Sequence, residues 1–126
     1  MGPEYLIDSN SLIDFFNNAL PQSGVDLLIN IEPRISIITQ IEVFSKRGLE
    51  RSEIEKLHKF TNAATVYDVN KAIAERAIYI RLNYNVKLPD AVIAATALCY
   101  NLILVTRNIA DFKNIVGLQI INPHSI

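Results

Sequence analysis

The chain has 126 residues, of which 50% are hydrophobic and 20% charged, and its formal net charge is −1. This length and composition fit a single globular domain, residues 1–126, with a sizeable core and no room for a second domain. The charge gives no strongly basic signature of a nucleic-acid-binding domain, and the longest apolar run, at 91–105, is shorter than the roughly 20 residues that a membrane helix needs.

Apolar runs alternate with amphipathic stretches along the whole chain. We expect strands at 4–8, 34–38, 64–67, 102–105 and 118–121, and helices at 10–18, 22–31, 39–47, 52–62, 70–84 and 90–100. This alternation predicts an α/β fold with a mainly parallel central sheet of about five strands. The carboxyl ends of parallel strands gather at one edge of the sheet, where open α/β folds bind their ligands.

The first expected strand and helix, "YLIDSNSLIDFF" at 5–16, contain an aspartate where the apolar run breaks. A lone buried charge is costly, so Asp8 is expected to be exposed, to cap the helix or to belong to a site. The start of the chain has no basic segment and carries Glu4 and Asp8 within its apolar stretch, which argues against a signal peptide. We therefore expect a cytoplasmic protein without a membrane partner.

Acidic residues fall at the active edge of the expected sheet in four places. Each has a purely structural alternative, because carboxylates often cap helices or sit in their first turn. "TQIE" at 39–42 matches a capping box, and Asn108 is expected to cap a short helix that contains the last acid. The four candidates are Asp8, Glu42, Asp90 and Asp111.

Together, carboxylates at one edge would repel each other unless a cation neutralised them. Mg²⁺ and Mn²⁺ take oxygen ligands from a few carboxylates and keep several waters. Such an ion lowers the pKa of bound water, and two ions about 3.5–4 Å apart can clamp both oxygens of a phosphodiester displacement. The combined pattern thus favours a Mg²⁺ or Mn²⁺ site over four separate caps.

Other site chemistries are poorly supported. His58, His124 and Cys99 lack zinc-type spacing, and we expect both histidines at the surface and the cysteine packed in the core. No G-x-S-x-G elbow or P-loop is present. A phosphoaspartyl hydrolase needs a second Asp two positions after the first, where this chain has Asn10. A receiver domain needs a second acid paired with Asp8, which is missing, although Asp68 could serve as its acceptor aspartate.

Five basic side chains within 46–59 alternate with acids and are expected to form a solvated helical surface: Lys46, Arg47, Arg51, Lys56 and Lys59. If the protein acts on nucleic acid, these residues and Arg107, beside the candidate site, would contact phosphates.

Three blocks carry a resemblance to a known family. "YLIDSNSLID", "ISIITQIEVF" and "KLPDAVIAATALCYNLILVTRNIADFKNIVGLQIINP", in this order, resemble the PIN-domain nucleases, and specifically the compact VapC-type toxins of type II toxin–antitoxin systems. The likeness spans nearly the whole chain, and its third block is the most specific. It implies a three-layer α/β/α PIN-like fold.

The resemblance also implies a metal site for Mg²⁺ or Mn²⁺ made by Asp8, Glu42 and Asp90, with a fourth acid after Thr106. Thr106 and Asn10 would steady the site by hydrogen bonding. This sequence departs from the commonest pattern at the fourth position, where Asn108 occupies the T-x-D place and Asp111 follows three residues later. Because only Asp111 offers anionic oxygen, we expect it to complete the site and Asn108 to support it.

The activity implied is metal-dependent hydrolysis of RNA phosphodiester bonds by water, with tRNA or ribosomal RNA as substrates. The choice of RNA over DNA comes from the resemblance and not from the residues. The implied partners are a small antitoxin, whose C-terminal segment would cross the acidic groove, and a second copy in a homodimer. Apolar positions in 22–31 and 52–62 are candidates for these contacts. A non-catalytic binding module, favoured by Asn108, is the alternative.

Overall fold

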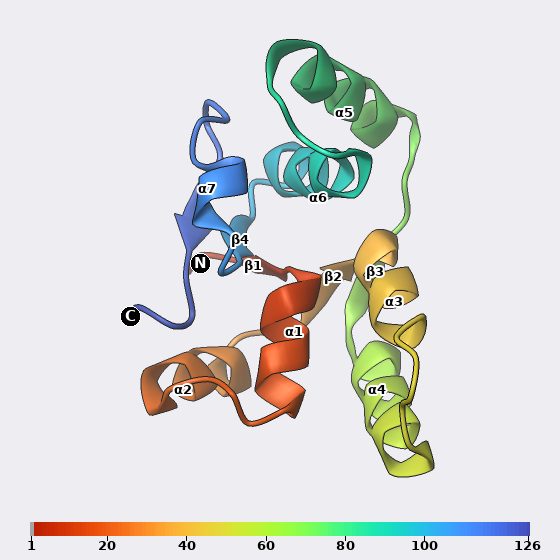
Figure 1. Ribbon diagram of the computed structural model, residues 1–126. Helices are drawn as coiled ribbons and strands as arrows, with labels where there is room; N and C mark the ends of the chain where they lie inside the picture. The colour runs from red at the N-terminus through yellow and green to blue at the C-terminus, as the bar shows by residue number, and fades with distance from the viewer. Residues whose placement is uncertain (1) are drawn as a thin grey trace.

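The computed structural model describes residues 2–126. Five short strands and seven helices follow each other within these residues (Figure 1). Their bounds are β1 Tyr5–Ile7, α1 Ser9–Phe16, α2 Gln22–Asn30, β2 Arg34–Ser36, α3 Ile37–Phe44, α4 Arg51–Ala63, β3 Thr65–Tyr67, α5 Lys71–Asn83, α6 Leu88–Cys99, β4 Ile103–Val105, α7 Ile109–Phe112 and β5 Ile120–Ile121.

All strand pairs in the described residues are parallel, which confirms the predicted α/β class. The strands form a three-stranded sheet, β1-β4-β5, and a two-stranded sheet, β2-β3, with β1 and β2 in contact where the two sheets meet (Figure 1). The prediction of one central sheet of about five strands is therefore wrong in its continuity, because only three strands are joined in the main sheet. In that sheet Ile7 pairs with Val105, so the residues that follow these two lie at the same edge.

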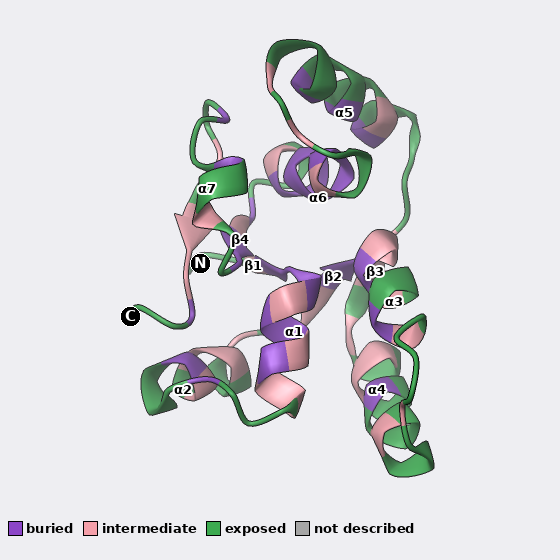
Figure 2. Ribbon diagram, in the orientation of Figure 1, coloured by how far each residue is buried: buried purple, intermediate pink, exposed green. Residues whose placement is uncertain are grey.

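Helices cover both faces of the strands (Figure 1). One buried cluster joins α5, α6 and α7 to β1 and β4, and its largest fully buried side chains include Phe112, Leu6 and Ile73. The other cluster joins α1, α3 and α4 to β1 and β2 around Leu12 and Ile35. Figure 2 shows α6 as the most buried helix, because it lies between α5 and the sheet. The strands are thus held between two apolar layers, and their carboxyl ends remain available for polar side chains.

Capping explains where several helices begin. The Asp8 side chain accepts a hydrogen bond from the N–H of Ser9 at the start of α1, as its structural alternative predicts. The capping box predicted at 39–42 is wrong, because α3 begins earlier, at Ile37, and is capped by Ser36. Glu42 therefore lies in the second turn of α3 and is free of a capping role. Pro89 occupies the first turn of α6, where its missing N–H costs nothing.

Two surface features differ from expectation. Cys99 is exposed at the end of α6, so the prediction of a core thiol is wrong. The residues around Cys99 in the sequence are apolar, but the buried part of α6 ends at Ala97, before this position. Exposed apolar side chains gather less on α2 and α4 than on α5 and the start of α6, where Ile78, Leu82 and Leu88 are 59%, 80% and 56% exposed. No helix within residues 2–126 is both long and apolar enough to cross a membrane.

Candidate active site

Asp8 is the most enclosed acid of the candidate site. It follows β1 and is only 3% exposed. Its Oδ1 accepts from the N–H of Ser9 at 2.8 Å, and its Oδ2 accepts from Thr106 Oγ1 at 2.8 Å and from Asn10 Nδ2 at 3.1 Å. Burial raises the pKa of Asp8, and the nearby Glu42 raises it further, whereas these hydrogen bonds lower it.

Thr106 is the polar centre of the strand edge. It follows β4, is fully buried and sits beside Asp8 because β1 and β4 pair in parallel. Besides donating to Asp8, its Oγ1 accepts from Asn10 Nδ2 at 3.2 Å and from the backbone N–H of Asn108 at 3.1 Å. The backbone N–H of Arg107 in turn donates to Asn10 Oδ1 at 3.2 Å. The expected supporting residues thus form one network that fixes the orientation of the Asp8 carboxylate.

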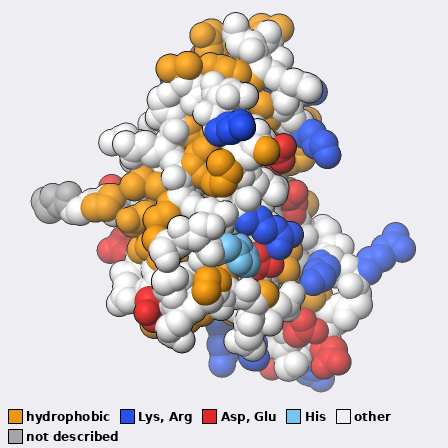
Figure 3. Space-filling view, turned by 60° about the vertical axis from the view of Figure 1, so that its left-hand side comes forward, with side chains coloured by type: hydrophobic (Ala, Val, Ile, Leu, Met, Phe, Trp, Pro, Cys, Tyr) orange, Lys and Arg blue, Asp and Glu red, His pale blue; other side chains and the backbone are white. Residues whose placement is uncertain are grey.

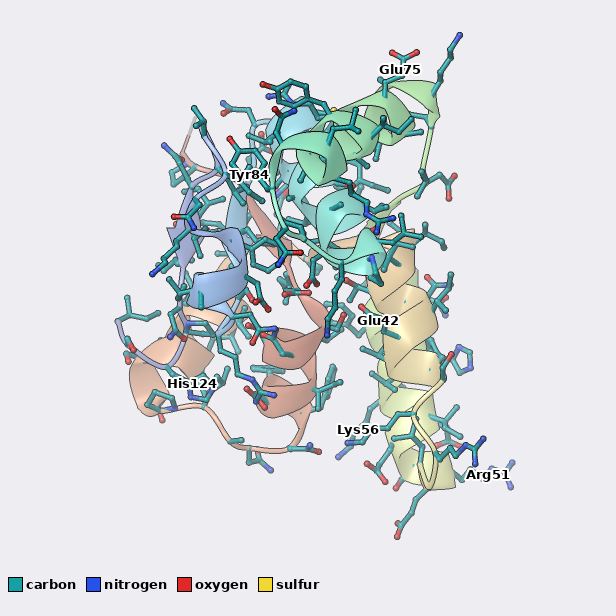
Figure 4. The ribbon with its side chains drawn as sticks, turned by 45° about the horizontal axis from the view of Figure 1, so that its top comes forward. Glu42, Arg51, Lys56, Glu75, Tyr84 and His124 are labelled. Carbon is teal, nitrogen blue, oxygen red and sulfur yellow. The ribbon has the colours of Figure 1, made fainter. Side chains whose placement is uncertain are left out.

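Glu42 reaches this edge from α3. Figure 4 shows its side chain where α1, α3 and α6 meet. The Ser9 hydroxyl donates a hydrogen bond to Glu42 Oε1, while the Ser9 N–H holds Asp8. Ser9 therefore bridges two of the candidate acids. Sequence analysis gave Ser9 no role, because a serine directly after a strand-end aspartate is an ordinary helix-start residue.

Asp90 and Asp111 form the opposite side of the site. Both line a cavity of about 350 Å³ that also includes residues 85–87 and Arg81. Burial raises the pKa of Asp90 to about 6, and the charges of Asp8, Asp111 and Glu42 add to this effect while Lys87 opposes it. All four predicted acids are therefore close enough to influence a single carboxyl group. Asn108 is exposed, and its side chain makes no hydrogen bond that caps α7.

The donor set fits a hard divalent cation, since it consists of carboxylates with neutral oxygen donors around them. The side chains are not yet arranged around a metal: among residues 2–126, no three His, Cys, Asp or Glu side chains are placed to hold one ion. Glu42 is turned to Ser9 and Asp8 to Thr106 and Asn10, which leaves Asp90 and Asp111 without hydrogen-bonding partners among the described side chains.

A second polar cluster adjoins the site and was not predicted. Asp14, on α1, is 7% exposed and accepts two hydrogen bonds of 2.9 Å from Arg107 Nη1, and its Oδ2 lies 2.8 Å from His124 Nε2. Figure 3 shows a histidine between basic and acidic side chains, and Figure 4 shows His124 in the C-terminal segment beside α2. His124 is an exposed residue whose side chain is 32% exposed, which confirms the predicted surface position, but the contact with Asp14 was not predicted. The same signal that drew attention to Asp8, an acid inside an apolar run, could have found Asp14.

The remaining predicted residues lie apart from the acids or at their margin. The Arg107 side chain is 51% exposed beside the site and is held by Asp14. The five basic residues of 46–59 are all exposed, and Lys46 and Lys56 border a groove between α1, α3 and α4 whose floor includes Phe16 and Leu57. His58 lies against Phe44, with ring centroids 4.7 Å apart, and takes no part in the site.

Comparisons with known proteins agree with this architecture. The sequence matches the family model described as the PIN domain over residues 5–118. It is similar to a chain of a toxin–antitoxin complex from Klebsiella pneumoniae, with 33% identity, a TM-score of 0.80 and coverage of 98% of this chain and 100% of that one. VapBC2 from Rickettsia felis bound to a promoter DNA fragment gives 26% identity, a TM-score of 0.78 and coverage of 94% and 97%.

A third structure, DNA-bound VapBC from Salmonella typhimurium, shares the fold, with 23% identity, a TM-score of 0.82 and coverage of 97% and 99%. Comparison with curated proteins gave no match.

Proposed function

This chain belongs to the PIN-domain family and is of the VapC type, and from this premise we propose that it is a Mg²⁺- or Mn²⁺-dependent endoribonuclease that acts as the toxin of a type II toxin–antitoxin pair. The observation that carries the catalytic part is the gathering of the acids: Ser9 hydrogen bonds to both Asp8 and Glu42. Asp90 and Asp111 line one cavity, and the charges of the other three acids raise the pKa of Asp90. Four carboxylates gathered from α3, α6, α7 and the end of β1 are costly without a cation, so their proximity favours a metal site over independent caps.

In this proposal Asp8, Glu42 and Asp90 hold the metal, and Asp111 completes the site. The chemistry supplied there by Mg²⁺ or Mn²⁺ is acidification of a water and stabilisation of charge on the phosphodiester. Asp8 is the fixed member, because Thr106, Asn10 and the Ser9 N–H determine its orientation. Glu42 and Asp90 are the adjustable members.

The positive side chains near the acids are proposed to bind the RNA backbone. Arg107 lies beside Thr106, and its Nη1 is directed to Asp14 by two hydrogen bonds. This arrangement leaves about half of the side chain open to a phosphate. The basic residues of 46–59 lie further from the acids and would extend the contact along the RNA.

The test of the proposal is cleavage of a mixed tRNA and ribosomal RNA preparation by purified protein, with and without Mn²⁺. We expect Asp8→Asn and Asp90→Asn to abolish cleavage while thermal melting shows an intact fold. The matched control is Glu75→Gln, because Glu75 lies on α5 and points away from the site (Figure 4). Equal cleavage by the parent and the Asp variants would overturn the catalytic proposal and favour a non-catalytic binding module. The acidic side chains of residues 2–126 do not already form a metal site, which is consistent with this alternative.

The partners proposed are a small antitoxin and a second copy of this chain. The relatives named above are toxin–antitoxin complexes, which supports the antitoxin. A C-terminal antitoxin segment that crosses the acidic groove and places an Arg or Lys among the carboxylates would relieve their repulsion. The strongest candidate for the homodimer surface is the exposed apolar face of α5 and α6, where Ile78, Leu82 and Leu88 border a groove.

The two partners are tested separately. Light scattering should show a dimer that Leu82→Glu converts to a monomer, whereas Ile29→Glu, on α2, leaves it dimeric. Copurification of a small protein from the native host should persist with Leu82→Glu. A monomeric parent and the absence of any small copurifying protein would contradict the respective proposals.

A further inference from the structure

The cavity beside Asp90 and Asp111 has a second wall that the catalytic proposal does not use. Arg81, in the last turn of α5, and the connecting segment 85–87 form this wall, and the whole cavity measures about 350 Å³. Figure 4 shows Tyr84, which opens this connection, at the end of α5. The cavity therefore has two acids on one side and two cations, Arg81 and Lys87, among its other lining residues.

The connecting segment is anchored, so its wall is present before any ligand binds. Tyr84 and Val86 pack against the larger apolar cluster. The Tyr84 hydroxyl accepts a hydrogen bond of 3.2 Å from the N–H of Val116, and the Val86 N–H donates to the Tyr84 carbonyl at 3.0 Å. Lys87 then occupies the N-cap position of α6, three residues before Asp90. A preformed wall lowers the ordering cost of binding.

The two cations are available for an anionic ligand. Within residues 2–126, neither Arg81 nor Lys87 forms an ion pair, whereas Arg107 on the other side of the site is already paired with Asp14. Both side chains belong to exposed residues. Lys87 is near enough to Asp90 to oppose the rise of its pKa, which places it at the border between the cavity and the acids.

We propose that this cavity binds the nucleotide next to the scissile phosphodiester of an RNA strand, with the phosphate of that nucleotide between Arg81 and Lys87. The inference rests on the proposed nuclease function and deepens it, because it gives the substrate a direction of approach from the acids to the α5–α6 connection. The cavity volume is within the range of small-ligand pockets of about 300–1,000 Å³. The Asn85 amide offers both a donor and an acceptor to a base edge.

An RNA strand fits the charges better than an acidic peptide does. The strand would pass a phosphate at the metal site and the next phosphate at the cations, so each anionic group meets positive charge. An acidic peptide would bring carboxylates toward Asp90 and Asp111 as well as toward the cations, and the like charges would oppose it.

The experiment measures binding of a fluorescein-labelled 12-nucleotide single-stranded RNA in EDTA, where no cleavage occurs. The test variants are Arg81→Gln, Lys87→Gln and their double variant. The matched controls are Arg76→Gln and Lys71→Gln, since both residues belong to α5, are exposed and do not line this cavity. We expect the double variant to raise the Kd about tenfold at low salt and to reduce the slope of log K against log[salt] by about 0.7, because the contact with one phosphate is lost. The controls should change neither quantity.

A second arm measures Mn²⁺-dependent cleavage and the binding of a labelled oligoglutamate peptide. The double variant should raise KM more than it lowers kcat, because it removes binding of a neighbouring nucleotide. If the folded double variant has the RNA affinity and the KM of the parent, the cavity assignment is overturned. If the double variant loses only the binding of the peptide, the cavity is assigned to an acidic protein segment instead. If the parent protein cleaves no RNA but the double variant still binds RNA more weakly than the parent, the cavity assignment stands and the nuclease proposal is rejected.

Discussion

Thr106 Oγ1 donates a 2.8 Å hydrogen bond to Asp8 Oδ2 across 98 positions of the sequence. The contact follows directly from the pairing of β1 with β4, which brings the residues after Ile7 and Val105 to one edge. Asn10 donates to both side chains from the first turn of α1. The most buried acid of the site therefore depends on two neutral groups, one local and one from the far end of the chain.

The first prediction is that Thr106→Val weakens Mn²⁺ binding about tenfold, because groups that orient a metal ligand are typically worth 10- to 100-fold in affinity. It should also reduce the free energy of unfolding by about 1–3 kcal/mol through the loss of a buried hydrogen bond. Isothermal titration and urea unfolding measure the two effects. Thr96→Val is the control, since Thr96 is buried but bonds only to Val92 of its own helix. Equal Mn²⁺ affinity of parent and Thr106→Val would contradict the assigned role.

The second prediction concerns pH. The pKa of Asp90 in the folded protein is about 6, above its ordinary value of 3.8. The folded state therefore holds a proton more tightly than the unfolded state, and stability is lost as pH rises from about 4 to about 6. Asp90→Asn removes this loss and should stabilise the metal-free protein at pH 7.5 by about 1 kcal/mol, a value reduced from the full shift because the side chain is only partly buried.

Urea unfolding of the parent and Asp90→Asn in EDTA at pH 4 and pH 7.5 checks this prediction. The gain should be much smaller at pH 4, where Asp90 is protonated in the folded state and roughly 40% protonated in the unfolded state. Glu75→Gln, at an exposed position on α5, is the control and should show no such pH dependence. A gain of the same size at both pH values would mean that the cost of ionising Asp90, through its burial and the nearby acids, does not cause it.

The element order and the candidate acids followed from the sequence because both depend on local patterns. Apolar runs of three to eight residues and the acids that break them were sufficient to place Asp8 after a strand and Asp90 in the first turn of a helix. The continuity of the sheet did not follow, because hydrogen bonding between β1 and β2 depends on the approach of two separate layers. The start of α3 was misplaced because Ser36 and Thr39 are both good caps, and the end of β2 decided between them.

Contacts between distant segments account for the features that were missed. Ser9 gains its role only when α3 brings Glu42 beside it. Asp14 gains its role only when Arg107 and His124, from the last fifth of the chain, reach α1. Neither partner could be read from the neighbourhood of these residues in the sequence.

The third prediction concerns the Asp14 cluster. Asp14→Ala should reduce the free energy of unfolding by about 2 kcal/mol, because it removes three hydrogen bonds from a buried carboxylate and leaves Arg107 and His124 without their shared partner. Arg107→Ala should also destabilise, since Asp14 is then left with His124 alone. Because the residues act together, the double variant should cost less than the sum of the two single variants, as urea unfolding will measure. Additive costs would show that the contact carries no coupling.

The fourth prediction concerns the attachment of the C-terminal segment. A Cβ at Gly24 would lie 2.2 Å from the carbonyl oxygen of Pro123, so Gly24→Ala must displace the segment that carries His124. Such overpacking typically costs about 1–3 kcal/mol, and the loss should be smaller when Asp14→Ala has already released His124. Gly2→Ala is the control, because a Cβ there meets nothing within 4 Å. Unfolding that is unchanged in Gly24→Ala would disprove the close packing of α2 against the segment.

The last prediction distinguishes Asp111 from Asn108 as the residue that completes the site. Asp111 lines the cavity with Asp90 and raises its pKa, whereas Asn108 contributes its backbone N–H to Thr106. A hard cation prefers anionic oxygen, so Asp111→Asn should weaken Mn²⁺ binding or RNA cleavage more than Asn108→Ala does. Asn108→Asp should preserve or raise activity, because it adds a carboxylate beside Thr106. Metal titration, cleavage assays and thermal melts on the three variants measure these effects. An inactive but folded Asn108→Ala together with a fully active Asp111→Asn would assign the fourth position to Asn108, because only a side chain that faces the metal or its water could then explain the loss.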